Sequence, residues 1–359
     1  MGVMPTALAG DGAPRPSLRC RAGIFPVLML FLSACTGGEV SEGPTPLPDA
    51  NPRVAGVVVV TQRFGGELAT IELPDGEPEP LSMPEDVRFV HAAYVIGDGS
   101  VLAVIERDHE RIQVYTLGTA SDPVAIGPPL RRAHSFALAA GRLLAARCDR
   151  AKSAWILDLE LPERWIPAPG GCGATLSPEG TVVAWSPDGR RVVQASTDPS
   201  APVEPVLDAA GLDGLPPGMR RLEVIGRLSW GPGGLAVPLG NNERQAAAVV
   251  EEDGTVAVTP LGDRGAGIGA SLAWQPSGGF LAVASWGTLE AIVRVFPPNG
   301  ESRVVAMDAD PIAGLLWSPG GEVLLAASQS RWTFVTAGGE WVRSTPVPRG
   351  ELVPIGWSA

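Results

Sequence analysis

Residues 317–321 read Trp-Ser-Pro-Gly-Gly, and the apolar run EVLLAAS follows them. The same order recurs in Trp274-Gln-Pro-Ser-Gly278 before GFLAVAS, in Trp230-Gly-Pro-Gly-Gly234 before LAVPL, and in Leu176-Ser-Pro-Glu-Gly180 before TVVAW. Proline presets the first backbone angle of a turn and glycine accepts a positive φ, so each copy predicts a tight turn that leads into a strand. The repeated unit is therefore strand, turn, strand.

The spacing of these units indicates the fold class. Trp230, Trp274, Trp317 and Trp357 are separated by 40–44 residues, the length of one four-stranded propeller blade. The 45 glycines and 36 prolines along the chain favour many short strands and disfavour long helices. We predict an all-β fold, a β-propeller, in which the tryptophans before the turns pack between neighbouring blades.

These units resemble the TolB-type, WD40-like propeller repeat, whose mark is Trp or Leu followed by Ser-Pro-Asp-Gly before a strand. Trp185-Ser-Pro-Asp-Gly189 is the best single match. The resemblance covers the blades but no TolB-like N-terminal domain, and the Gly-His and Trp-Asp dipeptides of true WD40 repeats are missing. It implies a propeller that binds a partner rather than one that catalyses.

Laying four strands per blade along the chain predicts seven innermost strands. They are expected near Val87–Ile96, His134–Ala139, Gly173–Ser177, Ile225–Trp230, Ala270–Gln275, Ala313–Ser318 and Val353–Ser358. Seven blades is the favoured count, and six or eight remain open. In the fourth blade, we place the turn at 185–189 between the second and third strands.

Ring closure follows from the two ends of the repeat. Val353–Ser358 looks like an innermost strand without its following turn and partners, while Val57–Gln62 and Leu68–Leu73 are strands without an innermost strand before them. We expect the C-terminal strand to complete the blade formed by the two N-terminal strands, which would leave the ring without a free edge.

The N-terminal segment has the layout of an export signal. Arg15, Arg19 and Arg21 precede the apolar run Ile24–Leu32, which is short for a membrane span. The sequence Leu32-Ser-Ala-Cys35 resembles the lipobox of bacterial lipoproteins, which implies cleavage before Cys35 and acylation of that residue. Because residue 36 is threonine and not aspartate, the resemblance implies the outer membrane in a cell with two membranes.

The chain therefore divides into a signal peptide (1–34), a lipidated cysteine with a polar, Gly- and Pro-rich tether (35–53), and the propeller (54–359). Cleavage would change the formal charge from −12 to about −14. This acidity makes nucleic acid an unsuitable partner.

The sequence shows no catalytic constellation. The three histidines, His91, His109 and His134, have no metal-ligand spacing, and neither a G-x-S-x-G elbow nor a phosphate-binding loop before a helix is present. We expect no metal and no cofactor. A lactonase- or lyase-like propeller enzyme stays as the alternative, with His91 and His134 as the titratable groups on innermost strands that could act as a base.

Two cysteines remain once Cys20 is removed and Cys35 is acylated. Cys148 and Cys172 form an even pair in an oxidising compartment, which predicts a disulfide bond between blades three and four. Two separate reduced thiols are the alternative.

Arginines mark the face of the propeller that holds the second-to-third strand loops and the inter-blade loops, which we call the upper face. The candidate binding residues are Arg63, Arg107, Arg111, Arg150, Arg190, Arg244 and Arg331. The loops of the opposite, lower face carry mostly acidic residues. We expect the upper face to bind an acidic envelope protein or an anionic glycan, and the alternative is that these arginines only solvate loops.

Overall fold

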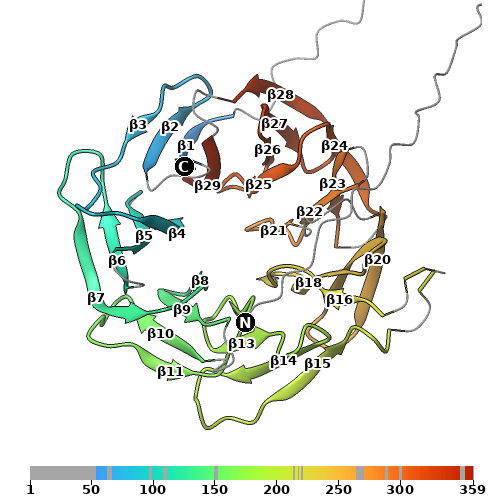
Figure 1. The fold of residues 1–359 in the computed structure, drawn as a ribbon. Helices are drawn as coiled ribbons and strands as arrows, with labels where there is room; N and C mark the ends of the chain where they lie inside the picture. Colours follow the sequence, from blue (N-terminus) through green and yellow to red (C-terminus); the bar gives the residue numbers. More distant parts are fainter. Residues whose placement is uncertain are drawn as a thin grey trace, which may run out of the picture. The chain divides into compact units, whose positions relative to one another are not determined.

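The tight turns and apolar runs form seven antiparallel sheets arranged in a ring in the computed structural model (Figure 1). The structure describes residues 54–62, 67–96, 99–107, 111–148, 153–212, 215–216, 218–219, 221–263, 271–287, 290–298, 301–347 and 352–358. Within these ranges no helix is long and apolar enough to cross a membrane. The prediction of an all-β, seven-bladed propeller is confirmed, and six and eight blades are excluded. The predicted signal peptide, Cys35 and the tether lie outside the described residues.

The four strands of each blade follow one another from the central channel to the outside of the ring. Blade 1 contains β29 (Leu352–Ser358), β1 (Gly56–Gln62), β2 (Leu68–Leu73) and β3 (Glu79–Pro80); blade 2 contains β4 (Phe89–Val95), β5 (Val101–Glu106), β6 (Arg111–Leu117) and β7 (Val124–Arg131). Blade 3 contains β8 (Ser135–Ala139), β9 (Arg142–Ala146), β10 (Ala154–Asp158) and β11 (Ile166–Ala168); blade 4 contains β12 (Thr175–Leu176), β13 (Val182–Trp185), β14 (Arg191–Ser196) and β15 (Glu204–Asp208). Blade 5 contains β16 (Glu223–Val224) and β17 (Ser229–Gly231), then β18 (Gly234–Gly240), β19 (Arg244–Val250) and β20 (Val256–Asp263). Blade 6 contains β21 (Ser271–Trp274), β22 (Leu281–Trp286), β23 (Ala291–Phe296) and β24 (Arg303–Asp308); blade 7 contains β25 (Ile312–Trp317), β26 (Val323–Ser328), β27 (Arg331–Thr336) and β28 (Trp341–Pro346).

The predicted innermost strands are observed with small shifts at their ends. The exception is blade 5, where the innermost strand is divided and both pieces pair with β18. The turn at Trp185–Gly189 joins β13 to β14, so its predicted place between the second and third strands is confirmed. Within it, the Asp188 carboxylate accepts the backbone N–H groups of Arg190 and Arg191, which lowers the pKa of Asp188 to about 2.

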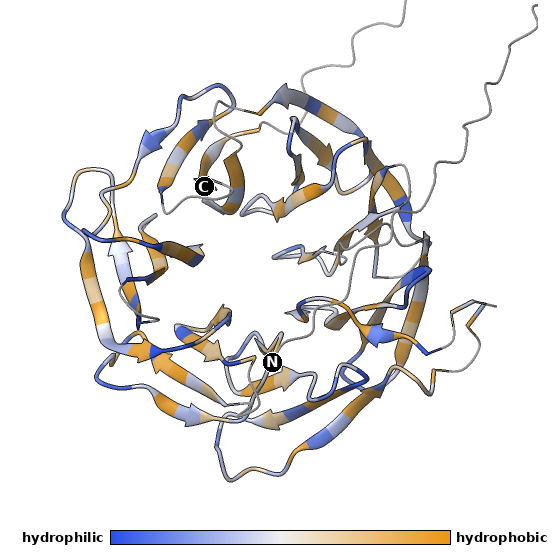
Figure 2. Cartoon of the chain, viewed as in Figure 1, coloured by the Kyte–Doolittle hydropathy of each residue, from blue (hydrophilic) through white to orange (hydrophobic). Residues whose placement is uncertain are grey.

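The hydrophobic core is divided among the contacts between blades. Seven apolar clusters occur, one at each contact between neighbouring blades; the cluster of Ala282, Val293, Leu315 and Leu324, for example, joins blades 6 and 7. Second strands are buried along nearly their whole length, as in β26, because both of their faces lie against a neighbouring blade. Figure 2 shows the resulting apolar colouring along the strands of the ring.

Tryptophans before the turns connect neighbouring blades, as predicted. The Trp317 Nε1–H donates to the Ala273 carbonyl of blade 6, and the Trp274 Nε1–H donates to the Ser229 carbonyl of blade 5, each at 3.0 Å. The Trp274 ring lies so close to the preceding turn that a Cβ on Gly233 would stand 2.6 Å from it. The Gly-Pro-Gly-Gly turn of blade 5 thus leaves the space that this indole occupies.

Closure of the ring occurs within blade 1. Strand β29 pairs antiparallel with β1, with Val57 opposite Ser358 and Val58 opposite Trp357. The Trp357 Nε1–H donates to the Ala55 carbonyl at 3.0 Å. The predicted pairing of the C-terminal strand with the N-terminal blade is confirmed.

Replacement of Trp317 by alanine tests the packing between blades. Trp317 is 6% exposed, so we expect Trp317→Ala to lower the free energy of unfolding by about 3–5 kcal/mol. Trp341, which is 65% exposed on β28, supplies the control, and Trp341→Ala should change stability by less than about 0.5 kcal/mol. Urea unfolding measures both variants, and equal losses would contradict a specific role for Trp317.

Candidate functional site

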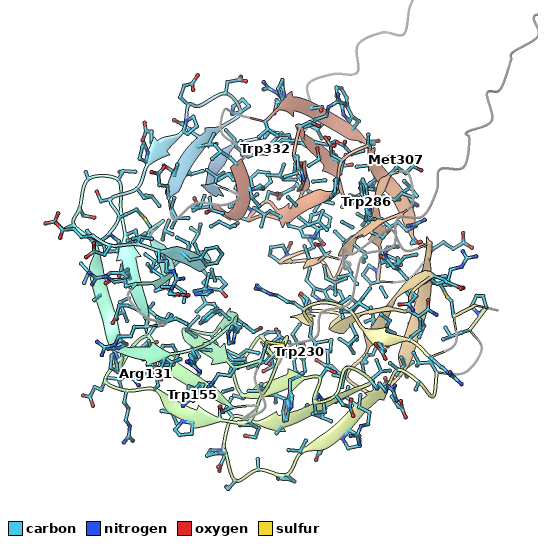
Figure 3. The ribbon with its side chains drawn as sticks, viewed as in Figure 1. Arg131, Trp155, Trp230, Trp286, Met307 and Trp332 are labelled. Carbon is cyan, nitrogen blue, oxygen red and sulfur yellow. A yellow bond between two sulfur atoms is a disulfide. The ribbon has the colours of Figure 1, made fainter. Side chains whose placement is uncertain are left out.

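The innermost strands surround a central channel. A cavity of about 1240 Å³ lies in it, lined by β8, β12, β17, β21 and Tyr94 of β4. Figure 3 shows side chains around this opening. Because innermost strands run from the upper to the lower face, the beginning of each marks the upper mouth of the channel.

His91 and Glu106 form a pair in blade 2. A register shift between Val90 and Ala92 places His91 at a bulge in the pairing of β4 with β5. Its Nε2 lies 2.9 Å from the Glu106 carboxylate, and Arg88 approaches the other carboxylate oxygen at 3.4 Å. Burial lowers the pKa of His91 despite the opposing effect of Glu106, so the ring is mainly neutral at pH 7.

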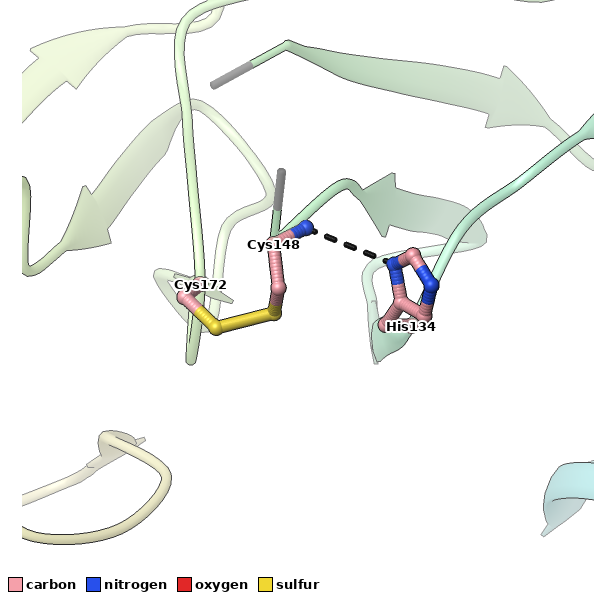
Figure 4. Close-up of a disulfide and its surroundings, with 3 residues drawn as sticks. All are labelled: His134, Cys148 and Cys172. Carbon is pink, nitrogen blue, oxygen red and sulfur yellow. Dashed lines mark hydrogen bonds between the residues drawn. A yellow bond between two sulfur atoms is a disulfide. The ribbon is translucent and has the colours of Figure 1, made fainter. Parts of the chain in front are cut away.

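His134 lies directly before β8, beside a disulfide bond (Figure 4). The Cys148 backbone N–H donates to His134 Nδ1 at 3.4 Å, so the proton of the neutral ring is carried by Nε2. Cys148 is bonded to Cys172 with a Cα–Cα distance of 4.4 Å, which links the end of β9 in blade 3 to the segment before β12 in blade 4. The bond therefore crosses the contact between these blades.

Arg227 lies between β16 and β17, where the innermost strand of blade 5 is interrupted. Gly173 of blade 4 packs against this segment, and a Cβ on Gly173 would stand 3.3 Å from the Gly226 carbonyl oxygen. The Gly173 carbonyl accepts a hydrogen bond from the Leu228 N–H at 3.4 Å. Arg227 is exposed and lines the channel, and its charge contributes to the lowered pKa of His91. Burial raises the pKa of Tyr94, so its hydroxyl stays protonated although the Arg227 charge opposes this effect.

The structure thus brings His91 and His134 near one another at the upper mouth, since the charge of His134 also affects the pKa of His91. Sequence reasoning considered both histidines but missed Arg227, Tyr94 and Glu106. An arginine inside a predicted innermost strand was the available signal for Arg227. In the described ranges no group of three or more His, Cys, Asp or Glu side chains could hold a metal ion.

Exposed arginines begin the third strands of four blades. They are Arg111 of β6, Arg191 of β14, Arg244 of β19 and Arg331 of β27. Since third strands start at the upper face, these side chains stand on its rim. Arg190 precedes Arg191 and lies 3.7 Å from Glu223, whereas Arg63 and Arg150 are outside the described residues.

Arg107, like Arg190 and Arg191, has side-chain partners on this face; Arg191 pairs with Asp188 at 2.7 Å. The Arg107 guanidinium donates to the Tyr115 hydroxyl at 3.2 Å and lies 4.0 Å from the Asp86 carboxylate. Its contacts hold it against blade 2, so it is less available to a partner than Arg111 or Arg331.

The lower face carries exposed carboxylates in its third-to-fourth strand loops and at their edges. They are Asp75, Glu77, Asp122, Glu160, Glu163, Asp198, Glu251, Glu252, Asp253 and Glu340. Arg343 pairs with Asp75. Carboxylates also occur among the arginines of the upper face, where Asp86, Asp188 and Glu223 lie beside Arg107, Arg191 and Arg190.

The disulfide bond is tested by its removal. It closes a loop with a sequence separation of 24, so the double variant Cys148→Ala/Cys172→Ala should lose about 3 kcal/mol of stability. Both thiols should also resist alkylation in the unfolded, unreduced protein. Complete alkylation before reduction would contradict the bond.

The pH dependence of stability tests the setting of His91. Its pKa is lower in the folded than in the unfolded chain, so the unfolded chain binds more protons and stability falls as pH drops through the unfolded value near 6.5. We expect the wild-type chain to lose more stability between pH 7.5 and 5.5 than His91→Gln, which keeps Glu106, His134 and Arg227. Urea unfolding at each pH gives the two slopes, and equal slopes would rule out His91 as their source.

Comparison with known proteins supports the fold. No family model matches the sequence, and no curated protein does so either. Among solved structures, the chain is similar to a Lactobacillus plantarum protein at 12% identity (TM-score 0.54; 85% of this chain and 98% of that one covered) and to the Pseudomonas aeruginosa periplasmic gluconolactonase at 16% (0.51; 84% and 99%). It is also similar to Sqt1 from Chaetomium thermophilum at 14% identity (0.52; 83% and 89%). At such identities the likeness shows a shared β-propeller fold.

Proposed function

We propose that this chain is a protein-binding or scaffold module of the bacterial cell envelope, held at a membrane through acylation of Cys35. The observation that carries the proposal is the row of exposed arginines on the upper rim. They begin the third strands of four blades, and the third-to-fourth strand loops of the lower face carry exposed carboxylates. Arginine pairs well with carboxylates and favours an acidic partner, which would be an envelope protein or an anionic glycan.

The orientation of the domain follows from its attachment. The tether would lead into β1, a second strand, which begins at the lower face. The acidic face would then lie toward the membrane and be repelled by anionic lipids, and the arginine rim would point away from it. A partner would meet the upper face first.

An enzyme that acts in the channel is the alternative, and the His91–Glu106 pair near Arg227 is the observation that favours it. A histidine paired with a carboxylate can act as a general base. One of the structural neighbours is a gluconolactonase, so a panel of lactones is the appropriate assay. Hydrolysis that is lost in His91→Gln would favour the enzyme over the binding module.

Charge reversal on the rim tests the binding face. We expect Arg111→Glu/Arg331→Glu, introduced into the full lipidated chain, to reduce capture of crosslinked membrane partners about tenfold and to remove its salt dependence. Arg164→Glu/Arg303→Glu makes the same charge change at exposed positions of the lower face and should leave capture unchanged. Equal capture by the wild-type chain and both variants would exclude the upper rim as the binding face.

A further inference from the structure

A second cavity opens at the upper mouth of the channel. It has a volume of about 380 Å³, and its lining includes His134, Ser135, the Cys148–Cys172 disulfide and Arg227. Gly226 and Arg227 line both this cavity and the channel cavity, so the two spaces meet at these residues. A small molecule could therefore extend from one into the other.

Several side chains that can donate hydrogen bonds line this junction, whereas the carboxylates in the channel lining are Glu179 and Glu252. The Arg227 guanidinium makes no hydrogen bond or ion pair with any residue that the structure describes, although it is exposed toward the channel. Ser135 is 3% exposed and its hydroxyl has no partner within the described ranges. A serine hydroxyl turns about χ1 among staggered positions, so Ser135 can offer its proton to a group that enters the cavity.

Two further donors stand beside Arg227. His134 uses Nδ1 as an acceptor for the Cys148 N–H, which leaves Nε2–H as the donor of the neutral ring. Tyr94 lines the channel and keeps its hydroxyl proton. The Glu106 carboxylate is paired with His91 and Arg88.

We propose that the junction at Arg227 binds a small monocarboxylate, whose charged group pairs with the Arg227 guanidinium and whose apolar body extends into the channel. One unpaired positive charge matches a single negative charge, and His91 adds none while it is neutral. Phosphate carries more charge and suits clusters of cations. Phe136, Leu138, Leu176 and Leu272 supply apolar walls for the body of the ligand.

This site is separate from the arginines of the upper rim. Its ligand is a small molecule within the channel, whereas the proposed partner of the rim is a macromolecule outside it. Binding of a monocarboxylate to the purified domain is therefore independent of whether the rim captures a partner from membranes.

Calorimetry with the purified protein at pH 7.5 tests the proposal. The probes are acetate, octanoate and phenylacetate, with octanamide, phenylacetamide and inorganic phosphate as comparisons. We expect saturable binding of at least one apolar carboxylate, and more than tenfold weaker binding of its amide and of phosphate. In a parallel titration, the ligand should quench the fluorescence of Trp230 and Trp274, which line the channel. Absence of saturation by every carboxylate up to about 10 mM, or equal affinity for the amide or phosphate, would overturn the proposal.

Variants assign the binding to the named groups. Arg227→Gln should weaken binding at least tenfold, and Arg227→Lys should weaken it less, because the charge is kept and the fork of donors is lost. Ser135→Ala removes a hydroxyl without a described partner, so it should weaken binding several-fold without lowering the melting temperature. Arg131→Gln, on the exposed outer strand β7 (Figure 3), is the matched control and should bind as the wild-type chain does. Unchanged affinity in Arg227→Gln, with its fold confirmed by its melting temperature, would overturn the assignment.

Discussion

Apolar contact between neighbouring blades is the interaction on which the rest of this structure depends. Each sheet has two apolar faces, and a ring of seven supplies seven contacts, each with its own cluster of buried side chains. No blade can bury both faces without both neighbours, so stability is shared around the ring. The disulfide and the indole hydrogen bonds add links across contacts that the apolar clusters already form.

In this arrangement the residues of the upper loops and of the channel mouth are not needed for packing between blades. The apolar residues of β22 and β26 are fixed by packing, whereas Arg111, Arg331 and Arg227 contribute nothing to the buried clusters. Substitution of these arginines would not disrupt the fold. The positions of the arginines are therefore more informative about binding than the composition of the strands.

The blade architecture could be predicted from the sequence because each repeat specifies its own strands and turn. Trp274, Trp317 and their Pro-Gly turns occur at blade spacing, and each turn needs only its own residues to form. The site was less predictable because it depends on departures from the repeat. His91 reaches Glu106 at a bulge, and Arg227 lies where the innermost strand of blade 5 is divided, and neither irregularity follows from periodicity. Tyr94 could not be predicted for a related reason: the register of β4 against β5 places it at the channel, and its residue type does not indicate this position.

The pairing of β29 with β1 has a consequence for how the chain reaches its native state. The hydrogen bond from Trp357 to Ala55 joins residues 302 positions apart, and blade 1 cannot be complete until both segments are present. Until then β1 is paired with β2 on one side only, and its other edge, formed by GVVVVTQ, is open to association with other chains. A chain that folds from its N-terminal end therefore keeps this edge open until residues 352–358 are present. The yield of folded protein then depends on how long the edge stays open as well as on the stability of the finished ring.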